Sequence, residues 1–172
     1  MPDKARSITI EVYGTPAPGG SKTVFGKNYT DACKGNRPWR AEVVKAVAAM
    51  FNFAWAVIPP KGKMHIAFAG GKPDPWPIFP KGVAVECSIV FWMPRPKYHF
   101  AKDGLIKPKY LRVYHVKTPD VDKLVRSTKD ALTDSGIWRD DSQDIGGNKV
   151  KYFHPPDRAP GATIRIAEVM ER

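Results

Sequence analysis

The stretch that most constrains the fold is VAVECSIVFWM, residues 83–93, because it is apolar on both faces over its second half. One face carries Val83, Val85, Cys87, Ile89 and Phe91, and the other carries Val90 and Trp92. A strand that is apolar on both faces is typical of the interior of a sheet rather than its edge. Cys87 lies on the uniformly apolar face, which favours a buried structural thiol over a reactive one.

The rest of the chain supplies two helices and further strands around this one. Alternation predicts strands over residues 7–13, 144–153 and 162–169, with a bulge or close backbone approach at Gly146 and Gly147. Helical spacing predicts helices over residues 38–51 and from just after Pro119 to Gly136. Residues 53–82 hold six prolines and predict at most one short strand, near residues 64–68.

The resulting order is strand, helix, strand, helix, strand, strand. It predicts a single layered domain over residues 1–172, of the α/β or α+β class, with a mixed β-sheet packed against two main helices.

The charge of the chain favours a polyanionic partner. Lys and Arg number 28 against 17 Asp and Glu, giving a net charge of +11, which suits DNA, RNA or, less well, an anionic membrane surface. The sequence lacks an apolar run near the roughly 20 residues that span a bilayer and an apolar signal-peptide core at its start. We therefore expect a cytoplasmic protein with no membrane partner, whose Cys33 and Cys87 are free thiols rather than a disulfide or a zinc site.

Two groups of cations are candidates for DNA contact. The denser one is Arg95, Lys97, Lys102, Lys107, Lys109, Arg112 and Lys117. These cations are interleaved with tyrosines, and the same segment contains one acid, Asp103. Such cations can hold phosphates, and the aromatic rings either stack on exposed bases or anchor the loop. A second group, which includes Lys22, follows the glycine-proline loop of residues 14–20 and is either an ordinary solvated surface or a first phosphate-contacting patch.

The chemistry is expected in TPDVDKLVRSTKDALTDSGIWRDDSQ, residues 118–143. Asp120 suits the N-cap of the second helix, Asp122 lies in its first turn, and Asp140 and Asp141 follow its end. Taken singly, these acids have ordinary explanations as a cap, a dipole partner and turn residues. Taken together, carboxylates from a helix start and from the edge of the next strand can hold Mg²⁺ for phosphodiester hydrolysis, and Arg126 can stabilise the developing charge.

The motifs D-x-D, D-A-L and D-D-x-Q within this segment resemble the signature of the RusA family of Holliday-junction resolvases, approximately D-x-D-N-x-x-K, D-A-L and D-D-x-Q. The resemblance implies a homodimeric endonuclease that depends on Mg²⁺, with Mn²⁺ as an alternative, and makes paired nicks across four-way DNA junctions in recombination and repair. It carries the three essential, metal-binding aspartates onto Asp120, Asp122 and Asp141. Because members occur in bacteria, phages and prophages, it implies a bacterial cytoplasm and leaves open a phage or prophage gene.

Two positions depart from the family pattern. Lys123 stands where the family has asparagine, and Arg126 stands where it has the catalytic lysine. Arginine forks and stays charged, so Arg126 can act electrostatically but not in proton transfer; Lys123 or Lys129 could take over part of that role. We count Lys123 among the expected DNA contacts. The alternatives are a metal-dependent nuclease for other branched DNA and a DNA-binding protein without catalysis.

Overall fold

A five-stranded mixed sheet forms the body of the protein in the computed structural model, which describes residues 5–20, 22–25, 28–31, 33–52, 54–74, 76–111 and 114–170. Its strands are β1 (Ser7–Tyr13), β6 (Val85–Met93), β7 (Asp144–Gly146), β8 (Lys149–Phe153) and β9 (Gly161–Glu168). β9 lies between β1 and β6 and is antiparallel to both. β7 and β8 follow one another along the other side of β6 and run parallel to it. The predicted mixed sheet, with residues 83–93 supplying an interior strand, is confirmed.

A glycine separates β7 from β8 on this edge of the sheet. Gly147 has φ +104°, and a Cβ atom placed on it would lie 2.6 Å from the carbonyl oxygen of Cys87. Any other side chain would therefore meet the neighbouring backbone. The expected close approach is confirmed at Gly147, whereas a Cβ atom on Gly146 would have nothing within 4 Å. The ladder resumes where Lys149 pairs with Ile89.

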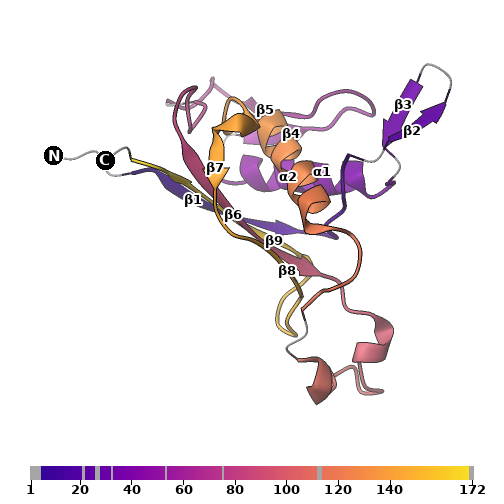
Figure 1. The fold of residues 1–172 in the computed structure, drawn as a ribbon. Coiled ribbons are helices and arrows are strands. Elements are labelled where there is room, and N and C mark those ends of the chain that lie inside the picture. The colour runs from indigo at the N-terminus through magenta and orange to yellow at the C-terminus, as the bar shows by residue number, and fades with distance from the viewer. Residues whose placement is uncertain are drawn as a thin grey trace.

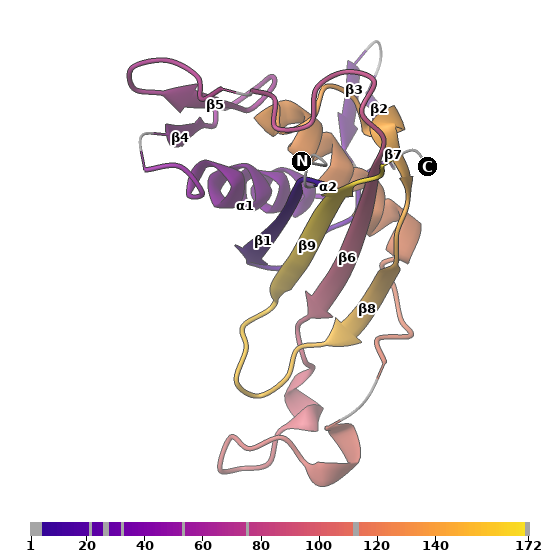
Figure 2. The ribbon, with the colours of Figure 1, turned by 90° about the vertical axis from the view of Figure 1, so that its left-hand side faces the viewer.

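The two helices, α1 (Asn36–Ala48) and α2 (Val121–Ser135), pack against each other and cover one face of the sheet (Figures 1 and 2). Beneath them, alternate residues of β6 are buried, and Val85, Cys87, Ile89 and Phe91 are fully so. The other face of the sheet carries no helix among the described residues. The domain is therefore a two-layer α/β structure with one open sheet face.

The helices lie close to their predicted positions. α1 begins two residues before the predicted start at residue 38 and ends three residues before residue 51. α2 begins directly after Asp120 and ends at Gly136, whose φ of +77° provides the left-handed C-cap. A buried bond from Trp39 Nε1 to Thr128 Oγ1, 3.0 Å long, joins the two helices.

Two short hairpins lie outside the main sheet. One pairs β2 (Lys22–Phe25) with β3 (Asn28–Asp31), and the other pairs β4 (Ala54–Val57) with β5 (His65–Phe68). The expectation of at most one strand in residues 53–82 is wrong, because β4 was missed. Its four residues give too short an apolar run to recognise, and its pairing partner lies eight residues further along the chain. Phe53 and Pro75 lie outside the described residues.

Residues 94–117 project beyond the end of the sheet as a separate lobe (Figures 1 and 2). This basic lobe contains two short 3-10 helices, η1 (Lys97–His99) and η2 (Pro108–Tyr110). It returns to the sheet through a bridge between Tyr114 and Tyr152 of β8 and then leads directly into α2.

Both cysteines are free, as predicted. Cys87 is fully buried in β6, and burial followed by the nearby charge of Asp144 raises the pKa of its thiol to about 12. The structural prediction for Cys87 is therefore confirmed. Neither helix in the described part of the chain has the length and apolar character of a bilayer span.

Candidate active site

The chain enters α2 through a segment that Lys151 of β8 holds in place. The Lys151 ammonium donates to the carbonyl oxygens of Lys117, at 2.6 Å, and Pro119, at 2.5 Å. These carbonyls lie on either side of Thr118, so one side chain from the sheet fixes the approach to the helix. Directly after this anchor comes Asp120, in a surface hollow of about 340 Å³.

Asp120 occupies the N-cap position of α2, as predicted, but its side chain does not cap the helix. Its backbone is extended, with ψ 145°, and its carboxylate accepts no N–H from the first turn. The side chain is 59% exposed and lies 3.6 Å from the ammonium of Lys123. A surface pair at that distance is weak and easily exchanged, so the carboxylate remains accessible to a cation.

Asp122 and Arg126 lie further along the exposed side of α2. Asp122 has no hydrogen-bond or ion-pair partner among the described residues, and its place in the first turn favours a negative charge. Arg126 lies against the glycine-proline loop, since a Cβ atom on Gly20 would be 3.1 Å from Arg126 Nη1. The amide of Gly19 donates to the carbonyl of Lys123 at 3.0 Å, so this loop lies along the first turns of the helix.

A buried asparagine clamps the same loop to α2. Asn36, the first residue of α1, donates through Nδ2 to the carbonyl of Pro18 at 3.0 Å and to Ser127 Oγ at 2.8 Å. A Cβ atom on Gly19 would lie 3.3 Å from Ser127 Cα, so a side chain there would crowd the backbone of α2. The sequence interpretation missed Asn36. The available signals were the glycine pair and a polar Ser127 on the buried side of the helix.

The two acids after α2 have different roles. Asp140 is the N-cap of η3 (Asp141–Gln143): its Oδ1 accepts the amide of Ser142, and its own backbone amide donates to Gln143 Oε1. Hydrogen bonding from the side chain of Ser142, and then from its amide, lowers the pKa of Asp140. Asp141 is exposed and, within the described part of the chain, has no hydrogen-bond or ion-pair partner. The fold thus uses Asp140 and leaves Asp141 free.

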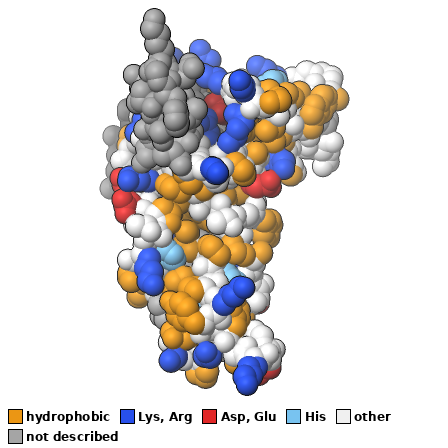
Figure 3. Space-filling model, turned by 90° about the vertical axis from the view of Figure 1, so that its right-hand side faces the viewer, with side chains coloured by type: hydrophobic (Ala, Val, Ile, Leu, Met, Phe, Trp, Pro, Cys, Tyr) orange, Lys and Arg blue, Asp and Glu red, His pale blue; other side chains and the backbone are white. Residues whose placement is uncertain are grey.

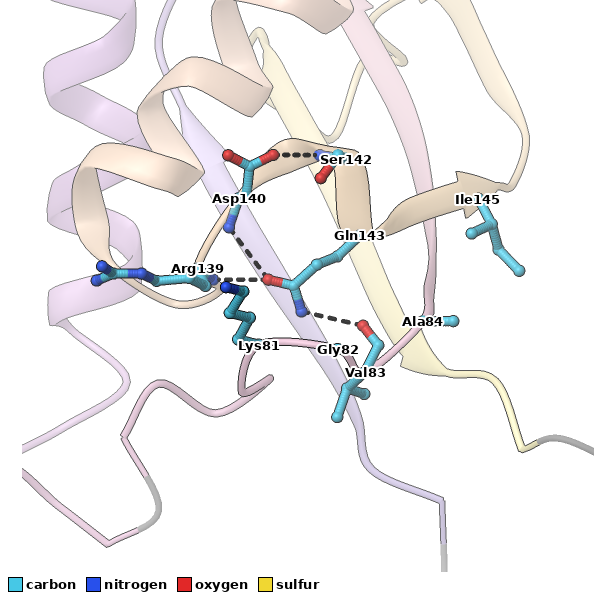
Figure 4. Close-up of a pocket in the computed structure, with 9 residues that line it drawn as sticks. All are labelled: Lys81, Gly82, Val83, Ala84, Arg139, Asp140, Ser142, Gln143 and Ile145. Carbon is cyan, nitrogen blue, oxygen red and sulfur yellow. Dashed lines mark hydrogen bonds between the residues drawn. The ribbon is translucent and has the colours of Figure 1, made fainter.

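Gln143 holds this turn to the loop that precedes β6. Its Oε1 accepts the amides of Arg139 and Asp140 at 2.9 and 3.1 Å, and its Nε2 donates to the carbonyls of Pro80 and Val83 at 2.8 and 3.0 Å. The side chain lies at the wall of an open pocket of about 640 Å³ (Figure 4). The D-D-x-Q motif therefore contains one free acid and two residues that position it. The sequence interpretation did not assign the glutamine.

The other acids nearby are engaged in the fold. Arg40 of α1 pairs with Asp134 and, at 4.0 Å, with Asp130. Burial raises the pKa of Asp130; the charges of Arg40 and Arg126 oppose that rise, and the charge of Asp141 adds to it. Asp130 is therefore within electrostatic range of both Arg126 and Asp141, which come from different elements.

Asp144 is the most deeply buried of these acids, with its side chain 3% exposed. Its Oδ2 lies 3.3 Å from the ammonium groups of Lys129 and Lys149, and its Oδ1 accepts the amides of Cys87 and Gly146. Asp144, Lys129 and Lys149 form a charged cluster, which joins α2 to β6, β7 and β8. Lys129 is thus occupied by Asp144.

The carboxylate oxygens of Asp120, Asp122 and Asp141 are the type of ligand that a hard divalent cation prefers. Mg²⁺ takes oxygen ligands and retains several waters, so it needs few protein carboxylates. Among the described residues, no three His, Cys, Asp or Glu side chains are already grouped closely enough to hold a metal. The three acids nonetheless have what a ligand needs, which is an exposed carboxylate that the fold does not use.

Arg95 has a structural role in the basic lobe. It is 8% exposed, and its guanidinium donates to the carbonyls of His154 and Tyr110, both at 2.6 Å. His99, beside it, stacks on the ring of Tyr110 with centroids 4.1 Å apart. Burial, and then the surrounding cations, lower the pKa of His99. Because the donors of Arg95 are bonded to backbone carbonyls of the lobe and of the segment after β8, we leave it out of the proposed DNA surface.

The other expected DNA-contacting cations are mostly at the surface. Lys97, Lys102, Lys109, Lys117 and Lys123 are exposed, whereas Lys107 is partly buried and donates to the carbonyl of Tyr98 at 3.0 Å. Figure 3 shows Lys and Arg side chains around hydrophobic ones on the lower part of the molecule, where the basic lobe lies. Arg112 and the side chain of Lys22 lie outside the described residues.

Comparison with models of known protein families shows to which family the chain belongs. The model of the family "Endodeoxyribonuclease RusA" matches residues 71–167, which include β6, the basic lobe, α2 and η3. The chain belongs to the RusA endodeoxyribonuclease family. The family is one of nucleases that hydrolyse phosphodiester bonds within DNA. A search of curated proteins gave no match.

Proposed function

We propose that this RusA family member is a Mg²⁺-dependent endonuclease that resolves four-way DNA junctions by paired, symmetric nicks in recombination and repair. The observation that carries the proposal is the division of the acids around α2. Asp134, Asp140 and Asp144 are engaged in ion pairs or a cap, and the half-exposed Asp130 lies 4.0 Å from Arg40. Asp120, Asp122 and Asp141 are exposed, and the fold leaves their carboxylates accessible. The accessible acids are those onto which the resemblance carries the family's three essential aspartates.

Each residue then has a defined part in the reaction. Asp120, Asp122 and Asp141 would hold Mg²⁺, with Mn²⁺ as an alternative. The bound ion supplies a Lewis acid and a more acidic water for attack on phosphorus. Arg126 neutralises charge on the phosphate, and it cannot shuttle a proton because a guanidinium stays charged. The lysines of the basic lobe, together with Lys123, hold the DNA backbone through its phosphates.

The proposed assembly is a homodimer in the bacterial cytoplasm, encoded by a bacterial, phage or prophage gene. Two nicks related by a two-fold axis need two sites related in the same way, and a C₂ dimer provides them. The net charge of +11 supports DNA as the partner.

A nicking assay on a synthetic four-way junction, with and without Mg²⁺, tests the proposal. Asp122→Asn should lower nicking by more than about 100-fold, since loss of a direct ligand should exceed the 10–100-fold cost of a second-shell change. Junction binding should persist. Asp157→Asn is the matched control, because Asp157 is exposed in the turn between β8 and β9. Undiminished cleavage by Asp122→Asn would refute the assignment.

The same assay on forks and linear duplex separates the two alternatives. Equal cleavage of forks and junctions would indicate a nuclease for branched DNA in general. Tight junction binding without nicks in any metal would indicate a binding protein without catalysis.

A further inference from the structure

Four aromatic side chains form one row across the helix-free face of the sheet. Tyr13 of β1 pairs with Gly161 of β9, Gly161 with Trp92 of β6, and Trp92 with Tyr152 of β8. Tyr152 in turn bridges to Tyr114 of the basic lobe. Directly paired residues on neighbouring strands send their side chains to the same face. We call Tyr13, Trp92, Tyr152 and Tyr114 the aromatic row.

The members of the row are in contact or linked by one cation. The rings of Tyr114 and Tyr152 lie 5.2 Å apart between centroids, and those of Tyr152 and Trp92 lie 5.9 Å apart. The Arg158 guanidinium lies 5.1 Å from the Trp92 ring and 6.0 Å from the Tyr13 ring. At about 4.8 Å between strands, the row spans roughly 19 Å. Its end rings, Tyr13 and Tyr114, are 59% and 66% exposed.

The surroundings of the row are mostly polar, apart from the paired Val90 and Val150 of β6 and β8 on the same face. Glu11 accepts bonds from Arg158 and Thr163, and Thr163 Oγ1 accepts the indole N–H of Trp92 at 3.1 Å. Further along the same face, Arg165 pairs with Ser88 across β9 and β6. A stable interface between copies of a chain has a large apolar core. A single line of rings with one neighbouring valine pair, bordered elsewhere by hydroxyl and charged groups, does not provide one.

The row instead meets a concentration of positive charge at its Tyr114 end. Residues 94–117 contain seven Lys and Arg against one Asp, and four of these lysines, Lys97, Lys102, Lys109 and Lys117, are exposed. Aromatic rings on an open sheet face next to cations are a general arrangement for holding unpaired nucleotides, because every base has a face that can stack. The row is also separate from the acids, since Lys151 beside it on β8 holds the acid segment from the other face.

We propose that the aromatic row binds unpaired bases of a DNA strand by stacking, while the lysines of the basic lobe hold that strand's phosphates. The inference rests on the proposed function for DNA as the partner. It adds a recognition surface for unstacked nucleotides, such as those at a branch point, on the face of the sheet opposite the acids.

Binding of a 12-nucleotide dT strand, measured by fluorescence anisotropy in EDTA, tests the row without any cleavage. Tyr13→Ala and Tyr114→Ala should each weaken this binding at least about fivefold, the loss expected for one stacked base. Binding to a 12-base-pair duplex should stay within about twofold, because it depends on phosphate contacts. Tyr114→Phe, which keeps the ring, and Trp55→Ala, an exposed aromatic of β4 away from the row, should bind dT like the wild type. Wild-type tryptophan fluorescence should fall on dT binding, and Trp92→Phe should remove that change.

Unchanged dT affinity in both alanine variants, with far-UV circular dichroism like that of the wild type, would overturn the inference. So would a shift in oligomeric state by light scattering without a change in dT affinity, since the row would then be a contact between copies. Junction nicking by the wild type tests the proposed function separately. A wild type that nicks junctions while its row variants bind dT normally would refute the row alone.

Discussion

Replacing Asp144 with alanine should be among the most damaging single changes in this protein. The replacement leaves the ammonium groups of Lys129 and Lys149 without their carboxylate, and the amides of Cys87 and Gly146 without an acceptor. Breaking a buried ion pair from one side costs roughly 3–5 kcal/mol. Because both lysines keep some exposure and can turn towards water, we expect the lower end, about 3 kcal/mol.

Asp144→Asn separates the charge from the hydrogen bonds. An asparagine oxygen can still accept the two amides, so only the ion pairs are lost, and pairs with partly exposed lysines contribute up to about 1 kcal/mol each. The expected cost is therefore about 1–2 kcal/mol. Urea unfolding at neutral pH gives the free energies, and a double-mutant cycle with Lys129→Met should give a coupling above about 0.5 kcal/mol.

The result that would refute this reasoning is a cost below about 1 kcal/mol for Asp144→Ala. It would mean that water or a neighbouring group replaces the carboxylate, so that the charged cluster does not join α2 to the sheet. Zero coupling between Asp144 and Lys129 would refute the ion pair specifically.

Three further predictions concern single side chains. Asp140→Ala should lower the urea midpoint, because it removes the cap of η3, and should retain part of the nicking activity. Asp141→Ala should leave the stability unchanged and abolish nicking. The reverse pattern would contradict the division of roles between the two acids. Because the pKa of His99 lies below its usual 6.5, the folded protein binds fewer protons than the unfolded one. Stability should thus be full above about pH 6.5 and fall as the pH drops below it, and His99→Phe should flatten that slope in urea titrations. In native protein at pH 8, iodoacetamide should modify Cys33 well before Cys87, whose pKa is about 12; equal rates by mass spectrometry would show that β6 opens readily.

The sequence predicts the main elements well where local pattern and burial agree. Alternation in residues 7–13 and 83–93 identifies β1 and β6, and Pro119 and Gly136 bracket α2. The strand β4 escapes prediction because its identity depends on pairing with β5, and that partner is not visible in four residues. Local sequence patterns predict where helices end and which face of a strand is buried. They do not predict which short segments pair with each other.

The sequence predicts which residues belong to the candidate site, but not whether each side chain is exposed or bonded within the fold. The sequence places Asp120 at an N-cap and Asp140 beside Asp141 without distinguishing a capping carboxylate from a free one. Arg95 resembles its neighbours in a basic run, yet it is buried because carbonyls from two loops converge on it. Such differences depend on contacts between residues distant in the chain.

The alternation of side chains along β8 has a consequence for insertions and deletions. Lys151 holds the segment before the acids on one face of this strand, and Tyr152 lies in the aromatic row on the other. A slip of one residue in the pairing with β6 would exchange the two faces and lose both arrangements at once. The link at Gly147 and Asn148, which lies directly before the β8 pairing and against the backbone of Cys87, should therefore tolerate a change of length less well than the surface loops do.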